Sequence, residues 1–321
     1  MKFIKFKPIY FNRIWGGSKL KEMFNRNIPN NANIGESWEI TDRPEATSIA
    51  TNGQFANISL ADIIANNQQY IMGKQWNKPF PILVKWIDAN QPLSIQVHPN
   101  TNTAKILNAE SKNENWFIVQ SQENSTIIAG FKPSVKSAST ENLTDGKWLR
   151  ENLNEISTKK GDSIFITGGC VHAIGKGNLI LEIQENSDTT YRLYDWDRLD
   201  DNGNPRKLHI DQSAKCINFS SPISVIETNQ NCPIKQNATL ENASILCNFE
   251  LFEIRHLKMS KNATIELQNG EAKIISLVQG TLIDDENNSI VCSENVLQPS
   301  AETLKLTALE DSEVLITKIK I

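Results

Sequence analysis

The sequence predicts a mainly β protein, built as a sandwich or barrel with a few peripheral helices. Most of the chain consists of short apolar stretches divided by Gly, Pro, Asn and Asp residues, which is typical of strands joined by turns. Helical periodicity occurs in only two stretches, so the regular alternation of strand and helix that builds a parallel sheet is not indicated. The 321 residues are enough to bury a sizeable core in one large or two ordinary domains.

The two helical stretches are residues 60–73 and 141–156. The first follows Ser59, a residue type that caps helices, and its apolar residues share one helical face: Leu60, Ile63, Ile64 and Ile71. The second aligns three apolar residues in the same way: Leu149, Leu153 and Ile156. We expect both helices to pack against a sheet.

The residue composition of the chain changes after Phe219. Residues 220–244 are polar and contain proline, as in a linker, and alternating strand patterns such as EAKIISLVQGTLI follow. We therefore expect a first domain over residues 1–220 and a second, smaller β domain over residues 235–321.

Charge and composition narrow the class of partner. The chain has 33 basic and 37 acidic residues, a net charge of −4, and no block of basic residues. We therefore expect a small-molecule ligand and no nucleic-acid partner. No segment approaches the ~20 apolar residues of a membrane span, and we expect a cytoplasmic protein. Five scattered cysteines without a CxxC pair indicate neither a disulfide framework nor a thiolate zinc site: Cys170, Cys216, Cys232, Cys247 and Cys292.

The stretch QPLSIQVHPN, residues 91–100, places two polar side chains inside an apolar strand pattern. Gln96 and His98 lie two residues apart and therefore share one face of the strand, while Ile95 and Val97 occupy the other. A buried amide and imidazole without partners would cost on the order of a few kcal/mol each. Either backbone groups satisfy them, or they bind a ligand.

Two further residues complete a possible metal-ligand set. His172 follows a glycine pair at the end of an apolar run, and Glu114 comes directly before the strand-like WFIV. With Gln96 and His98 they offer an amide oxygen, two imidazoles and a carboxylate, which suits a divalent ion such as Zn²⁺. Such a mixed set leaves the ion able to accept water or a substrate oxygen. His209 and His256 have no companions at ligand spacing, and we interpret both as structural or surface residues.

Three more charged residues lie in apolar surroundings. Lys85 lies in FPILVKWID, Glu182 among aliphatic residues in LILEIQ, and Arg192 between Tyr191 and Leu193. An ammonium such as that of Lys85 is costly in apolar surroundings unless an anion meets it. A buried ion pair with a structural role would explain Glu182 and Arg192, but their closeness in sequence to His172 favours a functional site.

The chain resembles the type I mannose-6-phosphate isomerases (phosphomannose isomerases) of the short bacterial form. The resemblance covers roughly residues 8–215 and rests on RIWGG, GESWEI, QPLSIQVHPN, SKNENWF, VHAIGKG and QENSDTTYRLYDWDR. It implies a cupin-type jelly-roll barrel or sandwich, with residues 1–220 as the catalytic domain and 235–321 as a degenerate cupin-like domain. Thr167 departs from the cupin pattern, which has proline there.

The resemblance also implies an activity and its residues. The family interconverts mannose 6-phosphate and fructose 6-phosphate, and its arginine taken as catalytic corresponds to Arg192. One zinc ion per chain is implied, bound through the family's Gln, His, Glu and His: Gln96, His98, Glu114 and His172. We expect a monomer or weak homodimer, with no membrane partner.

Aldose–ketose isomerisation moves a proton between two carbons through an enediol, so the site needs a base and a hold on the phosphate. Glu182 is our candidate for the proton carrier because its apolar neighbours can raise its pKa. Lys85, Ser94 and Lys112 are the candidates for contacts on the phosphate side. Two alternatives stay open: a cupin that holds Fe(II) for dioxygen chemistry, and a non-catalytic sugar-phosphate sensor.

Overall fold

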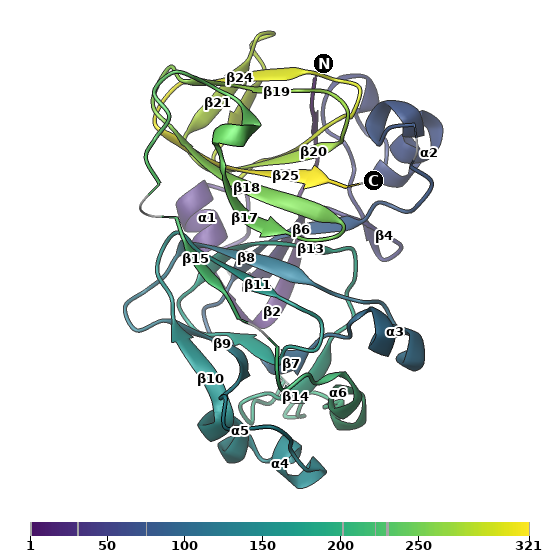
Figure 1. Ribbon diagram of the computed structural model, residues 1–321, viewed down its shortest axis with the longest axis vertical. Helices are drawn as coiled ribbons and strands as arrows, with labels where there is room; N and C mark the ends of the chain where they lie inside the picture. Colours follow the sequence, from purple (N-terminus) through teal and green to yellow (C-terminus); the bar gives the residue numbers. More distant parts are fainter. Residues whose placement is uncertain are drawn as a thin grey trace. The chain divides into compact units, whose positions relative to one another are not determined.

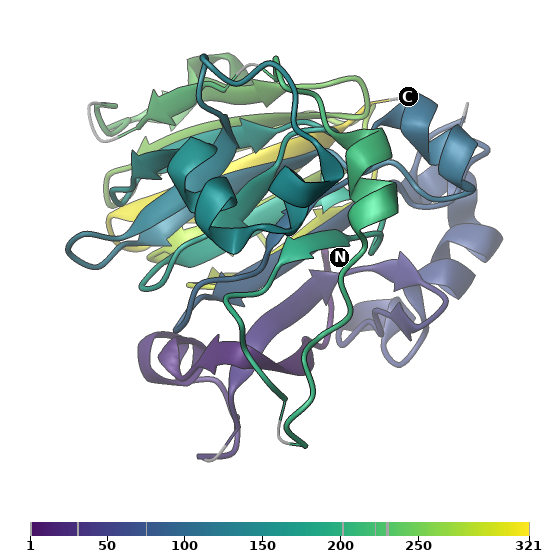
Figure 2. The same ribbon diagram turned by 90° about the horizontal axis from the view of Figure 1, so that it is seen from below.

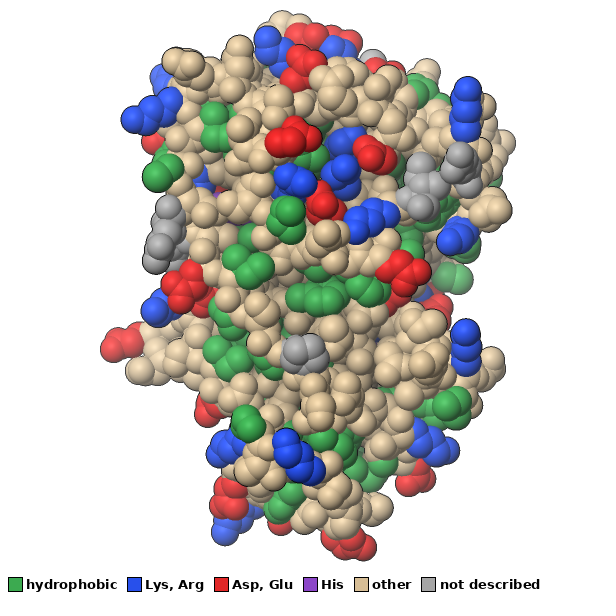
Figure 3. All heavy atoms as spheres, in the orientation of Figure 1, with side chains coloured by type: hydrophobic (Ala, Val, Ile, Leu, Met, Phe, Trp, Pro, Cys, Tyr) green, Lys and Arg blue, Asp and Glu red, His purple; other side chains and the backbone are tan. Residues whose placement is uncertain are grey.

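The computed structural model is mainly β, which confirms the predicted fold class (Figure 1). It describes residues 2–30, 32–74, 76–200, 202–221, 223–228 and 231–320. The strands form four sheets of five to seven strands and one two-stranded sheet. None of the helices in these ranges is long and apolar enough to cross a membrane. On the face drawn in Figure 3, basic and acidic side chains are interspersed, in keeping with the near balance of the two types.

The chain divides into two compact units that gather segments distant in sequence. The first unit comprises Met1–Ile9, Trp38–Val84 and Thr228–Ile321, and the second comprises Tyr10–Ser37 and Lys85–Glu227. The predicted second domain, 235–321, lies within the first unit, which also takes in two N-terminal segments. Residues 222, 229 and 230 of the expected linker lie outside the described residues. As separate domains, the ranges 1–220 and 235–321 stay predictions.

The first unit is built on two sheets. The six-stranded sheet has the order β1 (Ile4–Lys5), β23 (Asn295–Gln298), β20 (Lys273–Gln279), β25 (Ser312–Ile319), β18 (Phe252–Met259), β17 (Ser244–Asn248). The five-stranded sheet has the order β16 (Asn237–Ala238), β19 (Thr264–Leu267), β24 (Leu304–Ala308), β21 (Thr281–Asp284), β22 (Ser289–Val291). Alternate residues of both sheets form one core, as in a sandwich: Leu257, Ile275 and Ile316 from the first, and Ile265, Leu282 and Leu306 from the second.

Short elements complete this unit: β4 (Asp42–Arg43), β5 (Ala46–Thr47), η1 (Gly53–Phe55), α2 (Leu60–Ile71) and η2 (Leu240–Asn242). Helix α2 confirms the first predicted helix. The Ser59 hydroxyl accepts a hydrogen bond from the Asp62 backbone N–H, and the four expected apolar residues are buried.

The second unit carries a five-stranded sheet and most of a seven-stranded one. The five-stranded sheet has the order β10 (Leu153–Ser157), β9 (Thr126–Phe131), β12 (His172–Ile174), β7 (Ile95–Val97), β14 (Tyr191–Tyr194). The seven-stranded sheet has the order β15 (Val225–Glu227), β11 (Asp162–Ile166), β8 (Glu114–Gln120), β13 (Leu179–Glu185), β6 (Ile82–Asp88), β3 (Ile34–Ile40), β2 (Ile9–Gly17). The boundary between the units falls inside β2, β3 and β6.

The helices of the second unit are short: α1 (Lys19–Phe24), α3 (Thr101–Leu107), α4 (Thr140–Thr144), α5 (Gly146–Asn152) and α6 (Ile210–Cys216). The predicted helix over residues 141–156 is interrupted at Asp145 and is wrong over its last four residues. Asp145 ends α4 and caps α5 through its carboxylate, and the chain enters strand β10 at Leu153. Leu153 and Ile156 therefore belong to a strand, although their spacing also fits a helix.

The two faces of the five-stranded sheet have different surroundings. On one face, Ile95 and Val97 pack in a core with residues of α4, α5 and α6. Helix α4 contacts α5, α6 and β14, and α6 also contacts β7 and β14. Figure 2 shows these short helices, in teal and green, in front of the strands. Alternation turns Gln96 to the opposite face, toward the seven-stranded sheet. There a second core joins both sheets, and it includes Trp116, Ile127 and Ile174. The functional candidates lie on this inner face.

Candidate active site and metal centre

A cavity of about 350 Å³ opens in the second unit, and polar and charged side chains dominate its wall. The wall includes six predicted site residues: Lys85, Ser94, Gln96, Lys112, Glu114 and Glu182. Arg192 also lines it. His98 and His172 are 1% exposed and lie behind the wall, against Glu114. The structure therefore brings all nine predicted residues to one region.

Strand register aligns three of these residues. Strand β7 runs between β12 and β14, and Gln96 is directly opposite His172 on one side and Arg192 on the other. Directly opposite residues of antiparallel strands point to the same face of a sheet. This register therefore places His172, Gln96 and Arg192 in a row across the inner face of the five-stranded sheet.

The seven-stranded sheet supplies the facing residues. Glu114 and Trp116 lie two apart on β8 and are opposite Gln184 and Glu182 of β13, so these side chains share one face. Lys85 comes from β6, the next strand of the same sheet.

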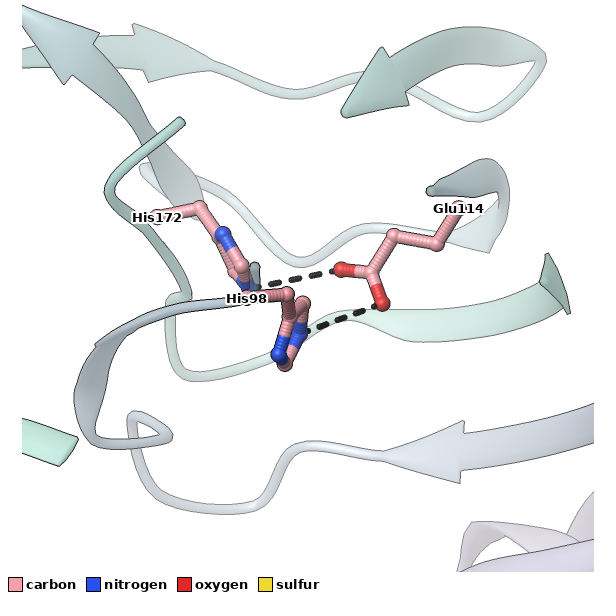
Figure 4. Close-up of side chains that lie close together, drawn as sticks. All are labelled: His98, Glu114 and His172. Atoms are coloured by element: carbon pink, nitrogen blue, oxygen red, sulfur yellow. Dashed lines mark ion pairs between the residues drawn. The ribbon is translucent and has the colours of Figure 1, made fainter. Parts of the chain in front are cut away.

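His98, Glu114 and His172 form a compact cluster whose possible ligand atoms all lie within 4.8 Å of one another. In Figure 4 both imidazoles point toward the Glu114 carboxylate, with His172 Nε2 3.3 Å from Oε1 and His98 Nε2 3.4 Å from Oε2. Two imidazole nitrogens and a carboxylate are one of the ligand sets found in catalytic zinc sites. The cluster therefore could hold such an ion.

Backbone contacts orient both imidazoles for this role. Nδ1 of His98 lies 2.8 Å from the Thr189 carbonyl oxygen, and Nδ1 of His172 lies 2.9 Å from that of Cys170. Each Nδ1–H can therefore donate to a carbonyl, which leaves the Nε2 lone pair directed at Glu114. Burial lowers the pKa of His172, and burial with the nearby Lys112 charge lowers that of His98 to about 3. Both rings are thus neutral near pH 7, the state that binds metal.

Two glycines bring the His172 segment close to His98. Gly169 has a φ of +94°, a region that favours glycine, and its N–H donates to the His98 carbonyl at 2.8 Å. A Cβ at Gly168 would lie 2.6 Å from the Pro99 carbonyl oxygen, so only glycine fits the close approach. The sharp turn expected at this glycine pair is present.

Glu114 is fully buried, and neither of its carboxylate oxygens accepts a hydrogen bond of normal geometry from a described residue. Burial acts to raise its pKa, but the Lys112 ammonium, 2.9 Å from Oε2, and the imidazoles outweigh burial and hold the pKa well below its ordinary value. An ionised carboxylate here requires a positive charge beside it. Either Lys112 or a bound cation can supply that charge.

Gln96 is half-buried and lies beside the cluster. Its Nε2 is 3.3 Å from His172 Nε2, and its Oε1 accepts a hydrogen bond from the Ser94 hydroxyl at 3.2 Å. The predicted ligand atom is the amide oxygen, and a half-turn of the amide exchanges the two atoms. The position of Gln96 is therefore compatible with the predicted role, which stays a prediction.

Glu182 lies on β13, and its buried carboxyl group contacts two polar side chains. Trp116 Nε1 donates to its Oε2 at 3.0 Å, and Lys85 Nζ lies 3.6 Å from its Oε1. Burial, together with the charge of Glu114, raises the pKa of Glu182 to about 7, even though Lys112 and Lys85 act in the opposite direction. A carboxyl group with this pKa can both accept and release a proton near neutral pH.

Arg192 lines the cavity beside Ser94. Its Nε donates to Ser94 Oγ at 3.3 Å and its Nη1 to the Lys207 carbonyl at 2.8 Å. The Arg192 backbone N–H donates to His209 Nδ1 at 3.1 Å, a contact that is compatible with the predicted structural role of His209. His256 is buried in the first unit with its Nε2 2.8 Å from Glu313 Oε1, which also agrees with a structural role.

Sequence reasoning assigned no role to several residues of the cavity wall. Arg13 and Glu36 form a two-bond ion pair at 3.0 and 3.1 Å, and they lie in the RIWGG and GESWEI motifs, which were a signal for them. Asp188 and Arg206 also line the wall. Arg206 follows the turn-rich stretch DDNGNP, where no strand periodicity marks which side chains face inward.

Comparison with known proteins identifies the family. The family model of the phosphomannose isomerase type I catalytic domain matches residues 3–125. The mannose-6-phosphate isomerase ManA of Bacillus subtilis is 40% identical over 218 residues, 67% of this chain and 68% of that protein. A mannose-6-phosphate isomerase of Streptococcus mutans is 38% identical over 211 residues, 65% of this chain and 66% of that protein.

Solved structures agree over the whole chain. The crystal structure of mannose 6-phosphate isomerase from Bacillus subtilis superimposes with a TM-score of 0.83 at 27% identity and covers 100% of both chains. A variant of the phosphomannose isomerase from Salmonella typhimurium has a TM-score of 0.77 over 100% of both chains at 17% identity, a likeness that shows the fold alone. The expected cupin fold is confirmed. The chain belongs to the type I phosphomannose isomerase family.

Proposed function

We propose that this protein interconverts D-mannose 6-phosphate and D-fructose 6-phosphate. The observation that carries the proposal is one cavity that combines the His98–Glu114–His172 cluster with a carboxyl group of raised pKa, Glu182, and a cavity-lining arginine, Arg192. Relatives that are 38–40% identical are named for this activity. Aldose–ketose isomerisation needs a base and a group that stabilises the enediolate, and a bound metal ion can polarise the sugar oxygens.

The donor set supports one zinc ion per chain. His98 Nε2, His172 Nε2 and a Glu114 oxygen would hold it, with the Gln96 amide oxygen as a weaker fourth ligand. The geometry around Glu114 is an observation independent of the family: its fully buried carboxylate faces the Nε2 atoms of two imidazoles at 3.3 and 3.4 Å. When bound, zinc would polarise the oxygen atoms of the sugar.

Glu182 is the proposed proton carrier. Its Oε1 accepts no hydrogen bond of normal geometry from a described residue, whereas Oε2 is held by Trp116. Oε1 would take the proton from C2 of the open-chain aldose, the C–H electron pair would form the enediolate double bond, and the same proton would return at C1 to give the ketose. The carbonyl electron pair of C1 moves to O1, and O1 gains the proton that the O2 hydroxyl loses as O2 becomes the carbonyl oxygen, so atoms and electrons balance.

Arg192 is the proposed stabiliser of negative charge in this step. Its guanidinium lies beside Ser94 Oγ, and both side chains line the cavity, so the pair can hold an enediolate or phosphoryl oxygen. Lys85 and Lys112 stay predicted substrate contacts. In the structure each lies against a carboxylate, Glu182 and Glu114 respectively, which limits how much charge they offer to a phosphate.

A coupled assay tests the function. The purified protein is given mannose 6-phosphate, fructose 6-phosphate is followed with time, and the metal is removed with a chelator and then restored as zinc. We expect turnover that is lost with the metal and returns with zinc. Turnover that is unaffected by full removal of metal would overturn the metal role, and absence of turnover in the zinc-loaded protein would overturn the activity.

The two alternatives have distinct outcomes. An Fe(II) cupin would consume dioxygen when iron is added, and a sensor would bind mannose 6-phosphate without converting it. The expected cytoplasmic location and the expected monomeric or weakly dimeric state stay predictions, which cell fractionation and sedimentation of the purified protein can measure.

A further inference from the structure

We propose that Asp195 is a positioning residue that fixes the Arg206 guanidinium on the cavity wall, so that Arg206 and Arg192 together hold the anionic end of the substrate. The inference rests on the proposed function, since it assigns that end to the phosphoryl group of a sugar phosphate. Asp195 itself does not line the cavity, and it would act only through the arginine.

The contacts of Asp195 show how it fixes Arg206. The residue directly follows β14 and is 5% exposed. Its Oδ2 accepts from Arg206 Nε at 2.7 Å, while its Oδ1 accepts from Arg206 Nη2, which makes a two-bond fork. Two parallel bonds to a carboxylate set the plane of a guanidinium as well as its position. Arg206 is thereby held with part of its side chain against the cavity.

Arg198 holds Asp195 from the other side. Its Nη2 donates to Asp195 Oδ1 at 2.5 Å and its Nη1 to the Pro92 carbonyl oxygen at 2.7 Å. Arg198 is thus tied to the backbone before β7, whereas Arg206 reaches the cavity wall. The Pro92 carbonyl therefore holds Arg198, Arg198 holds Asp195, and Asp195 holds Arg206.

Charge balance along the wall indicates what binds there. Three of the four wall carboxylates each face a cation on the wall: Glu36 with Arg13, Glu114 with Lys112, and Glu182 with Lys85. The fourth, Asp188, acts on the charges of Arg13 and Lys112 at this same end of the wall.

The other end of the cavity is different. Asp195 is the carboxylate shared by Arg198 and Arg206, and Arg192 beside them donates to neutral oxygens, those of Ser94 and Lys207. Burial and the charge of Arg206 both lower the pKa of Arg192, in agreement with guanidiniums that are close together.

The three guanidiniums and one carboxylate leave a surplus of two positive charges at this end. A phosphate monoester carries about −1.5 to −2 at pH 7, which matches the surplus. A neutral sugar alone would leave the positive charges of two neighbouring arginines without a balancing negative charge. The arrangement therefore suits a phosphorylated substrate whose phosphoryl group meets Arg192 and Arg206.

The two possible effects of Asp195 on anion binding have opposite signs. If Asp195 only reduced the local positive charge, its removal would make the cluster more positive and phosphate would bind more tightly. If Asp195 positions Arg206, its removal frees the guanidinium to turn toward solvent, and phosphate binds more weakly. The sign of the change therefore separates the two roles.

The test uses the full-length, zinc-loaded protein and inorganic phosphate as the probe. Asp195→Asn keeps the shape of the side chain and removes its charge, and Arg206→Ala removes the guanidinium. For both variants we expect the phosphate inhibition constant and the KM for mannose 6-phosphate to rise about tenfold, with a much smaller change in kcat. Asp285→Asn, in the exposed Lys2–Asp285 ion pair of the first unit, is the matched control and should leave both constants near the wild-type values.

A double variant tests whether Asp195 acts through Arg206. Asp195→Asn combined with Arg206→Ala should be no worse than Arg206→Ala alone, because the positioned group is already absent. Equal or tighter phosphate binding by Asp195→Asn, or a double variant whose loss is the product of the two single losses, would overturn the proposal. If Asp195→Asn does not fold, wild-type phosphate affinity in Arg206→Ala would overturn it.

Failure of the proposed function is recognisable separately. Phosphate binding is also measured directly by titration calorimetry, which needs no turnover. A wild-type protein without isomerase activity would overturn the function, while the calorimetric comparison of the same variants would still decide the role of Asp195.

Discussion

Replacing Lys112 with methionine tests whether Glu114 and the imidazoles form a cation site. The Lys112 ammonium lies 2.9 Å from Glu114 Oε2 and 3.2 Å from His98 Nε2. Its own pKa is raised, because the charges of Glu114 and Glu182 outweigh the effect of burial, so the group is positively charged. Methionine keeps an unbranched apolar side chain without the charge. The Lys112→Met variant therefore leaves the Glu114 carboxylate buried with no ammonium beside it.

The expected loss of stability is large in the metal-free protein. Removal of one partner of a buried ion pair costs about 3–5 kcal/mol, because the other charge stays in the interior uncompensated. At about 2–4 °C per kcal/mol, the melting temperature of the second unit should fall by roughly 6–20 °C. A zinc ion bound by ligands at about 2.0–2.3 Å would supply the missing charge and lie close to the site of the ammonium. We therefore expect zinc to stabilise the variant more than the wild type.

Differential scanning calorimetry of the chelator-treated protein, with and without added zinc, measures both effects, and competition with a chromophoric chelator gives the zinc affinity. The matched control is Lys273→Met, which removes a buried lysine from the first unit, where Nζ donates to the Gln268 and Glu271 carbonyl oxygens at 2.7 and 3.0 Å. Zinc should not restore its stability. The reasoning would be refuted if the metal-free Lys112→Met variant had the melting temperature of the metal-free wild type. It would also be refuted if zinc raised the melting temperatures of the two variants equally.

Three further outcomes are expected for the same site. His98→Ala should lose bound metal and turnover together, as elemental analysis and the coupled assay report, and a fully active metal-free variant would exclude His98 as a ligand. Arg192→Ala should keep its metal and lose about a hundredfold or more in kcat, whereas unchanged turnover would remove Arg192 from the mechanism. Glu182 must be ionised to accept a proton, and burial with the Glu114 charge raises its pKa to about 7, so kcat/KM should fall as the pH drops through this region. Trp116→Phe removes a hydrogen bond that favours the ionised form and should move this acid limb to higher pH; a limb that does not move would show that Glu182 is not the titrating group.

Much of the fold could be predicted because local pattern and tertiary packing agree. Helix α2 combines an N-cap at Ser59 with one buried face, so propensity, capping and periodicity all favour the same element. The polar residues of the site could be found for the opposite reason. Gln96 and Glu182 interrupt strand patterns that are otherwise apolar, and a polar group in such a position requires a partner.

The failures have equally local causes. Three apolar residues at helical spacing predicted one helix over residues 141–156, but Asp145 breaks the helix and Leu153 pairs with Phe131 in a sheet, a contact that sequence periodicity does not report. The first compact unit combines segments from both ends of the chain, which a linear change of composition cannot reveal. Arg206 was missed because its place on the cavity wall depends on Asp195, eleven residues earlier.

The pattern that folds the five-stranded sheet also assembles the site. Ile95 and Val97 must face the core under α4–α6, so alternation turns Gln96 inward, and the register of β7 with its two neighbours then sets His172 and Arg192 beside Gln96. A shift of the β7 register by one residue would turn Ile95 and Val97 toward the cavity and bury the Gln96 amide under the helices. Both changes would cost folding free energy. The hydrophobic requirement of the sheet therefore fixes the distance between the possible metal centre and the arginine, and no separate interaction between the two is needed to align them.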